Sequence, residues 1–367
     1  INPPQSGSNA FEEISQPFIP ESPSTSRPIE PAPTNVIVTN SDVSPVEEKP
    51  LISNAPAGPS INDLVPTVDP KSLSPSKWPE QMAKFTFKEV VAAQVLLDRL
   101  NFSVNCIDGE YGRQTKEAVL AFQKAKGFFP SGELTSETLS ALGDPLMTLS
   151  SYTLTEQDIQ GLGRVPDLWK EKAALSTLPY VTTLEMVAEK FHATKKAIER
   201  LNPSLPWPNP PANSQIIVPS IERPPLKKAA RIKVSLSRKT VWALDETNGV
   251  IGVFPCSIAQ HKEKRPVGDL KVLNYSPGPN YTFDPKVFPE SEEAKTINGK
   301  LIIPPGPNNP VGSAWVGLNL PGYGMHGTPN PEDIGHTESH GCFRLANWNA
   351  SKLLKMIKVG TPVMIEE

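Results

Sequence analysis

Apolar positions recur at helical spacing between residues 85 and 145. Two stretches there place apolar side chains three and four residues apart, which is typical of a helix with one buried face. These residues are Val90, Val91, Val95, Leu96 and Leu100 in the first stretch, and Ala118, Val119, Phe122 and Ala125 in the second. Gly127 is a stop signal for the second helix, and Thr135 or Ser136 can cap a short third helix that ends at Leu142. The pattern predicts a small all-α module of three helices.

Residues 179–222 predict a smaller α+β unit. Thr182 and Glu185 have the spacing of a capping box, so a helix is expected to begin there. A second helix is expected over 194–201, and the apolar run 216–219 is typical of a closing strand.

The period of the pattern changes to two after residue 229. Ile232, Val234 and Leu236 alternate with polar residues, as in a half-buried strand. An Asn-Gly pair at Asn248 separates two apolar runs, which is a strong short-range signal for a hairpin. Strands are expected at 241–244, 250–258, 268–275, 300–303, 314–320 and 361–366, and one helix over 346–358. Many short strands with one helix predict a mainly-β, β-sandwich-like domain in a multidomain chain.

The composition sets the start of the chain apart from these modules. The chain has 367 residues and 42 prolines, and residues 1–84 are rich in Pro and Ser without a helical or strand period. We expect this segment to be a disordered tether, and residues 146–178, which carry few signals, to be a connector. The net charge is −3 and no basic stripe is present, so nucleic acid is not an expected partner. No apolar run reaches the roughly 18 residues of a membrane helix. The numbering begins at Ile1, and we expect a signal or membrane tether upstream of it.

The stretch from Gly324 to Leu345 concentrates the residues that can carry chemistry. It holds three of the five histidines, and Cys342 is one of only three cysteines. A glycine-flanked cysteine with histidines before it has the parts of a thiolate nucleophile, so the site is expected to lower the pKa of the thiol. His326 is the expected base. Gly341 allows a tight turn that would direct the amides of Gly341 and Cys342 at an oxyanion.

The remaining cysteines and histidines receive structural assignments. Cys106 and Cys256 are expected to pack as small apolar residues, because an odd set of cysteines argues against a disulfide framework. We expect His192, His261 and His336 at the surface.

A zinc site is the alternative interpretation of the histidines near Cys342. His326, His336, His340 and Cys342 are ligand types that suit zinc. The glycines beside His336 and His340 argue against a helix that would align these two side chains, and the chain has no C-x-x-C pair. We expect neither a metal nor a cofactor.

Two of the modules resemble cell-wall-binding domains. Residues 88–143 resemble the three-helix peptidoglycan-binding module, whose D-G-x-[FY]-G loop and A-V-x-x-F-Q helix match the sequence here. The matching residues are Asp108, Gly109, Tyr111, Gly112, Ala118, Val119, Phe122 and Gln123. The unit 179–222 resembles a LysM module in its βααβ order and its Leu-Asn-Pro ending. The usual Gly-Asp-Thr opening is replaced by Val181-Thr182-Thr183-Leu184, so glycan binding and a spacer role both remain open for this unit.

Residues 229–367 resemble the L,D-transpeptidase catalytic domain, also called the YkuD domain. The signature is His326-Gly327-Thr328 followed by Ser339-His340-Gly341-Cys342-Phe343-Arg344-Leu345, in which Cys342 lies 16 positions after His326. Arg265-Pro266-Val267-Gly268 is similar to the T-P-x-G element of the family, with Arg in place of Thr. The segments 305–312 and 315–318 also match its longer members.

The resemblance implies a cysteine acyltransferase that acts on peptidoglycan stems. Cys342 would attack the carbonyl of the third stem residue and expel the terminal D-alanine, and the thioester would pass to a second stem to form a 3→3 cross-link. The carbonyl of Gly327 would hold the second nitrogen of His326, and His340 would lie beside the sulfur. The implied partners are stem peptides and glycan strands, and the implied location is the periplasm or cell envelope.

The resemblance also implies substrate-binding roles for four further residues. Ser339 would orient nearby groups, and Tyr323 would supply a hydroxyl near the reacting carbonyl. Asn308 lies in the matching segment 305–312. Arg344 is either a structural anchor or a partner for a stem carboxylate.

Other activities remain open at this point. Water in place of the amine would make the protein an L,D-carboxypeptidase or a cross-link hydrolase. A wall-binding scaffold with a silent site is the non-enzymatic alternative. A papain-like protease has its cysteine before its histidine, which is the reverse of the order here.

Overall fold

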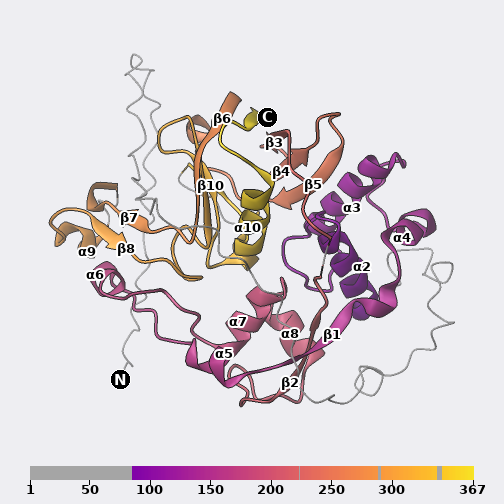
Figure 1. The fold of residues 1–367 in the computed structure, drawn as a ribbon, viewed down its shortest axis with the longest axis horizontal. Helices are drawn as coiled ribbons and strands as arrows, with labels where there is room; N and C mark the ends of the chain where they lie inside the picture. The colour runs from indigo at the N-terminus through magenta and orange to yellow at the C-terminus, as the bar shows by residue number, and fades with distance from the viewer. Residues whose placement is uncertain (1–84, 223, 288–290, 337–340) are drawn as a thin grey trace, which may run out of the picture. The chain divides into compact units, whose positions relative to one another are not determined.

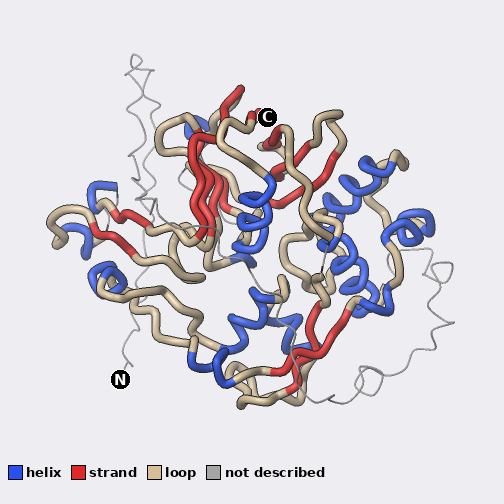
Figure 2. The backbone as a smooth tube through the Cα atoms, viewed as in Figure 1, coloured by secondary structure: helices blue, strands red, loops and turns tan. Residues whose placement is uncertain are grey.

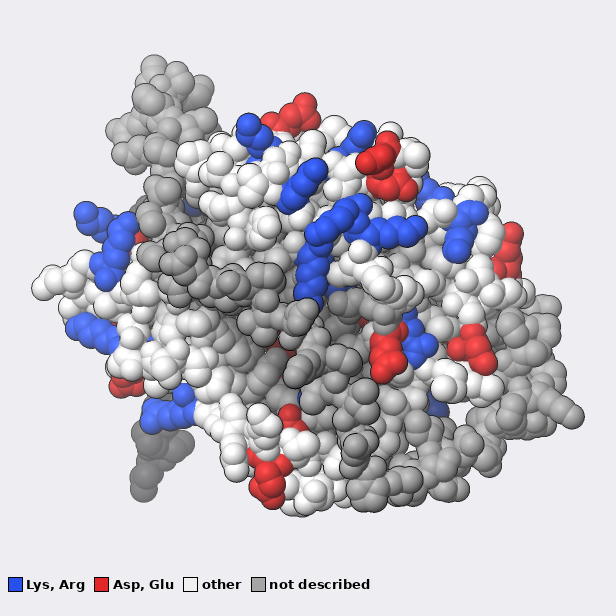
Figure 3. Space-filling model, in the orientation of Figure 1, with Lys and Arg blue, Asp and Glu red and all other residues white. Residues whose placement is uncertain are grey.

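The structure, a computed structural model, describes residues 85–222, 224–287, 291–336 and 341–367. The predicted tether 1–84 and the candidate residues Ser339 and His340 lie outside the described residues. Within the described ranges, no helix is both long and apolar enough to cross a membrane. Basic and acidic side chains are interspersed on the face drawn in Figure 3.

The predicted three-helix module is confirmed. It consists of α2 (Phe87–Arg99), α3 (Arg113–Lys126) and α4 (Ser136–Leu142). Thr86 and Glu89 form a capping box at the start of α2, and Thr135 caps α4. Gly127 ends α3 in the left-handed conformation, with φ 74°. Ala125, which was expected on the buried face, lies in the exposed last turn of α3.

A buried glutamine builds the loop between α2 and α3. The amide of Gln94 donates to Asp108 Oδ1 at 2.7 Å, and its oxygen accepts from the backbone N–H groups of Asp108 and Gly109. Gly109 has φ +72°, and a Cβ there would lie 2.1 Å from the Phe87 ring. The Asp-Gly pair of the motif is therefore required by backbone geometry and close packing.

The next unit is larger than predicted. Strand β1 (Leu149–Thr153) pairs antiparallel with β2 (Gln215–Pro219), and the four helices between them are α5 (Glu156–Gln160), α6 (Trp169–Ala173), α7 (Thr183–Lys190) and α8 (Lys195–Leu201). The prediction that 146–178 is a plain connector is therefore wrong, because the segment supplies the first strand and two helices. The cap of α7 is present only in part: Thr182 accepts from Glu185 N, but the Glu185 carboxylate accepts from Val181 N.

The C-terminal domain is built on a mixed sheet of eight strands (Figure 2). Its order is β11-β10-β9-β6-β12-β3-β4-β5. The strands are β3 (Arg231–Ser235), β4 (Thr240–Leu244), β5 (Val250–Pro255), β6 (Gly268–Pro277), β9 (Ala314–Leu318), β10 (Gly324–His326), β11 (Phe343–Arg344) and β12 (Pro362–Glu366). The first half of β6 pairs with β12 and the second half with β9, so one long strand continues through both parts of the sheet. The expected sandwich is therefore a single curled sheet.

Helix α10 and a small hairpin complete this domain. Helix α10 (Asn347–Met356) packs against β6, β9 and β10 (Figure 1), and its apolar residues join the core under the sheet. A separate two-stranded sheet is formed by β7 (Tyr281–Phe283) and β8 (Leu301–Ile303), with the short helix α9 (Glu292–Lys295) between them. Short 3-10 turns cover Pro145–Met147, Lys262–Lys264, Pro285–Val287 and Pro331–Asp333.

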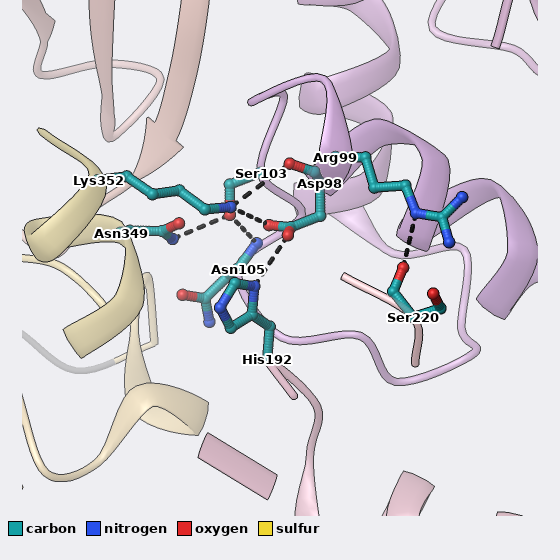
Figure 4. A network of polar contacts seen from close by, with 8 residues as sticks. All are labelled: Asp98, Arg99, Ser103, Asn105, His192, Ser220, Asn349 and Lys352. Carbon is teal, nitrogen blue, oxygen red and sulfur yellow. Dashed lines mark hydrogen bonds and ion pairs between the residues drawn. The ribbon is translucent and has the colours of Figure 1, made fainter. Parts of the chain in front are cut away.

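A buried charge cluster joins the three modules (Figure 4). Asp98 of α2 accepts from Lys352 of α10 at 2.7 Å and lies 2.8 Å from His192, which follows α7. The prediction that His192 is a surface residue is wrong, because its ring is buried against Asp98 and stacks on Trp348. Burial alone would raise the pKa of Asp98, but the charges of Lys352 and His192 hold it well below its ordinary value.

Candidate active site

The register of two short parallel strands brings the candidate nucleophile and base together. Met325 and His326 of β10 lie opposite Phe343 and Arg344 of β11. Side chains two positions apart share a face of a sheet, and neighbouring strands are about 4.8 Å apart. Cys342 directly precedes β11 and lies two positions before Arg344, so extending the strand by one residue would place it on the face that Arg344 shares with its neighbour His326.

The backbone determines which nitrogen of His326 is basic. The Nδ1 atom lies 2.6 Å from the carbonyl oxygen of Gly327. Because a carbonyl only accepts, Nδ1 carries the proton and Nε2 is left with the lone pair. The ring is buried and lies nearly parallel to Trp315, with 5.7 Å between the ring centroids. The hydrogen bond to this backbone carbonyl holds the imidazole in one tautomer.

Burial makes both reacting groups neutral at rest. It lowers the pKa of His326 to about 4, and the nearby charge of Arg344 acts in the same direction, against the hydrogen bond to Gly327. Burial also raises the pKa of the Cys342 thiol to about 11, partly offset by a hydrogen bond with the Gly324 backbone. The sequence-based expectation of a lowered thiol pKa is therefore wrong for the resting site. A nucleophilic thiol loses its proton as it attacks, and the free Nε2 of a neutral histidine is a group that can accept one.

Tyrosine side chains flank the sulfur. Burial raises the pKa of Tyr323, as does the charge that Cys342 carries when it is ionised, and a Cβ on Gly341 would lie 3.7 Å from the Tyr323 ring. Burial and the same charge raise the pKa of Tyr281, which lies on β7. Both phenols therefore remain protonated at neutral pH and can donate hydrogen bonds. The sequence reasoning missed Tyr281, because no spacing relates it to the motif.

Arg344 is held through its backbone on both sides. It exchanges two hydrogen bonds with Ser257, at 2.9 and 3.1 Å, and it faces His326 across the strand pair. Burial lowers the pKa of its guanidinium, and the charge of Asp333 opposes that shift. Both predicted roles, structural anchor and carboxylate partner, remain compatible with this position.

Asn308, a predicted substrate-binding residue, contacts the preceding module through its side chain. Its amide donates to the carbonyl of Pro179 at 2.7 Å and to Glu185 Oε1 at 2.6 Å. Pro179 precedes α7, and Glu185 lies in the first turn of that helix. The structure therefore brings Asn308 together with the preceding module, and its amide donors are used there.

Helix α6 of the preceding module also packs against aromatic residues that lie near Cys342. Trp169 of α6 stacks on Phe283, with 4.3 Å between centroids, and its ring lies 6.0 Å from that of Tyr281. The backbone N–H groups of Trp169 and Lys170 donate to the Glu293 carboxylate. Trp169 packs in the same apolar cluster as Tyr281 and Cys342. Figure 1 shows α6 beside the β7–β8 hairpin.

Four other cysteines and histidines have the burial that the sequence predicted. Cys106 and Cys256 are buried, as predicted, and His261 and His336 are exposed, as predicted. Cavities of about 440 Å³ and 590 Å³ are lined by residues around Asp284–Lys300 and around Phe87 and Arg200, respectively, and neither includes Cys342.

Two domains of the chain are similar to known protein domains. Residues 229–365 match the family model described as the L,D-transpeptidase catalytic domain, and residues 88–142 match a peptidoglycan-binding domain. A Bacillus licheniformis protein that carries the name of the L,D-transpeptidase YkuD is 29% identical over 183 residues, which cover 50% of this chain and 93% of that protein. An Escherichia coli relative that carries the name L,D-transpeptidase ErfK/SrfK is 25% identical over 186 residues, which cover 50% of this chain and 58% of the relative. The crystal structure of the L,D-transpeptidase (residues 123–326) from Xylanimonas cellulosilytica aligns over 76% of this chain and 93% of that one, with 17% identity and a TM-score of 0.31.

Proposed function

We propose, because residues 229–365 match the L,D-transpeptidase catalytic domain, that the chain forms 3→3 cross-links between peptidoglycan stems through a thioester on Cys342. The observation that carries the proposal is the pairing of β10 with β11, together with the tautomer that Gly327 imposes on His326. These features give one face of the sheet both a thiol and a base whose free nitrogen is Nε2.

In the first half-reaction, the Cys342 sulfur attacks the carbonyl carbon of the third residue of a tetrapeptide stem. The thiol proton moves to His326 Nε2 as the carbon–sulfur bond forms. The amides of Gly341 and Cys342, with the Tyr323 hydroxyl, are the donors available to the oxyanion. The carbon–nitrogen bond to the terminal D-alanine then breaks, and His326 returns the proton to the departing amine.

In the second half-reaction, the side-chain amine of another stem attacks the thioester carbonyl. His326 takes a proton from that amine and returns it to the sulfur, so the thiol is restored and a new amide bond remains. Water in the same position would release a tripeptide stem. The sequence of bonds made and broken is therefore the same for the transferase and the carboxypeptidase until the acceptor arrives.

The peptidoglycan-binding domain supports a polymeric substrate for the catalytic domain. Residues 88–142 match that domain, and its helix α2 is tied to the catalytic helix α10 by Asp98 and Lys352. We propose that the domain binds the cell wall and holds Cys342 near the stems. An enzyme with this substrate acts in the cell envelope, outside the cytoplasm. We also propose that β1, α7, α8 and β2 form a LysM-like unit, on the basis of the antiparallel pairing of the two strands around this helix pair, with α5 and α6 as an insertion after the first strand.

Incubation with purified tetrapeptide muropeptides tests the proposal. Mass spectrometry is expected to show D-alanine release, a mass increase on Cys342 and dimers with a 3→3 link, and Cys342→Ala is expected to remove all three. Tripeptide products without dimers would assign the protein as a carboxypeptidase. No adduct and no D-alanine release from protein with a reduced thiol would overturn the proposal.

A further inference from the structure

Asn347, the first residue of α10, packs directly against the loop that orients His326. Its Oδ1 atom accepts from Ser313 N at 3.0 Å, and a Cβ on Gly327 would lie only 2.1 Å from that oxygen. Gly327 supplies the carbonyl that holds His326 Nδ1. The position of the Asn347 amide therefore limits where the Gly327 carbonyl can lie.

The orientation of this amide depends on a carboxylate from the preceding module. The Nδ2 atom of Asn347 donates to both oxygens of Glu189 on α7, at 3.0 and 3.1 Å, and to the carbonyl of Pro307 at 3.2 Å. An ionised carboxylate only accepts hydrogen bonds, so it requires the NH₂ group to face α7 and the Oδ1 atom to face Ser313 and Gly327. A protonated carboxyl group carries its own donor and tolerates the opposite orientation.

The surroundings of Glu189 place its titration in the physiological range. Burial raises its pKa to about 7, against the hydrogen bonds from Asn347 and Tyr180 that lower it. Glu185 on the same helix adds a raising contribution. Tyr180 donates its hydroxyl proton to Glu189 at 2.9 Å, and the buried Cys106 thiol is also within range of the carboxylate charge.

We propose that Glu189 is a positioning residue that acts through Asn347 and Gly327 to hold His326 for proton transfer, so that the LysM-like unit forms part of the active-site support. The proposal rests on the proposed function of His326. The ionised carboxylate keeps the amide oxygen against Ser313, and the Gly327 carbonyl stays in line with Nδ1. Protonation of Glu189 releases this restraint, and the imidazole loses its fixed orientation.

The experiment compares three variants with the wild-type chain between pH 5.5 and 8.5. Glu189→Gln replaces one carboxylate oxygen by an NH₂ group, which opposes the Asn347 NH₂. Glu185→Gln is the matched control, because Glu185 accepts from Asn308 and Val181 and makes no hydrogen bond to Asn347. Tyr180→Phe keeps the carboxylate but removes one hydrogen bond that lowers its pKa.

Two readouts are measured. The first is the rate of the D-alanine-releasing step, and the second is the NMR signal of the His326 Nδ1 proton, assigned by its loss in His326→Gln. The wild-type rate is expected to rise with pH as Glu189 ionises, and the NMR signal is expected to change over the same range, both with a midpoint near pH 7. Glu189→Gln is expected to remove this change and to lower the rate at pH 8 roughly tenfold, as for a hydrogen bond to a charged group. Glu185→Gln is expected to keep the change at a slightly lower pH, and Tyr180→Phe to move it to higher pH.

A midpoint near pH 7 that persists in Glu189→Gln would overturn the proposal. If Glu189→Gln does not fold, the direction of the shift in Tyr180→Phe decides, and an unshifted midpoint would overturn the proposal equally. The NMR signal reports on His326 without substrate. It therefore separates a failure of this coupling from a failure of the transpeptidase assignment, in which wild-type protein would release no D-alanine.

Discussion

Replacing Lys352 with methionine removes the cation from a buried ion pair that joins the peptidoglycan-binding module to the catalytic domain. The side chains of Lys352 and Asp98 are each 1% exposed, and 2.7 Å separates the ammonium nitrogen from the carboxylate oxygen. Methionine has a similar length and can fill the same space, so the variant isolates the effect of the charge.

The expected loss of stability follows from the carboxylate that is left behind. Removing one partner of a buried ion pair typically costs about 3–5 kcal/mol, because the other charge remains buried. Asp98 keeps its contact with His192 at 2.8 Å, so we expect the lower end, about 3 kcal/mol. For a domain assembly of this size, that corresponds to a fall in melting temperature of roughly 6–12 °C.

The pH dependence of Lys352→Met has a definite sign. The folded-state pKa of Asp98 is lowered, so its ion pair stabilises the fold above the unfolded-state pKa and this contribution is lost as the pH falls. In the variant, Asp98 has lost its cationic partner, so its pKa rises. At neutral pH the buried Asp98 carboxylate is ionised without this partner, which destabilises the fold, and protonation of Asp98 at lower pH removes that cost. Lowering the pH from 7 to 5 should therefore narrow the difference between variant and wild type.

Calorimetry at both pH values, with circular dichroism as a second probe, measures these effects. The double variant Asp98→Asn/Lys352→Met is the control, and it should recover at least half of the loss because no unpaired carboxylate remains. A Lys352→Met protein within about 0.5 kcal/mol of wild type would refute the reasoning, since that is the range of an ordinary surface substitution.

Three further outcomes are expected. Cys342→Ala should abolish thioester formation in intact-mass analysis and change the melting temperature by less than about 2 °C, and a much larger fall would contradict its place at the start of a short strand. His326 stays neutral in the fold, with its pKa lowered from 6.5 to about 4. Stability should therefore fall by up to about 3 kcal/mol as the pH drops from 7 to 4, and His326→Gln should flatten this dependence. Trp169→Ala removes the stack on Phe283 behind Tyr281, so kcat/KM for tetrapeptide stems should fall about tenfold with the thiol content unchanged. Unchanged kinetics in Trp169→Ala would show that α6 has no part in the site.

Local signals were sufficient for much of the fold. Helices α2, α3, α4, α7, α8 and α10 begin and end near the positions that capping residues, glycines and apolar spacing predict. Strands with strict alternation of apolar and polar residues, such as β3, could also be predicted. The strand β1 was missed, because its sequence Leu-Ser-Ser-Tyr-Thr carries no clear alternation and its stability comes from pairing with β2, more than sixty residues away.

The sequence by itself predicted the candidate reactive groups of this protein: a glycine-flanked Cys342, His326 sixteen positions before it, and Gly327, whose carbonyl is expected to orient the ring. The tertiary structure decided the rest, because each remaining feature depends on atoms far apart in the chain. Burial, which spacing does not reveal, makes the thiol and the imidazole neutral. Non-local packing turned His192 inward against Asp98 and gave Asn308 partners near α7. It also placed Glu189 behind the histidine loop, because a carboxylate can reach Asn347 only after α7 and α10 have packed together.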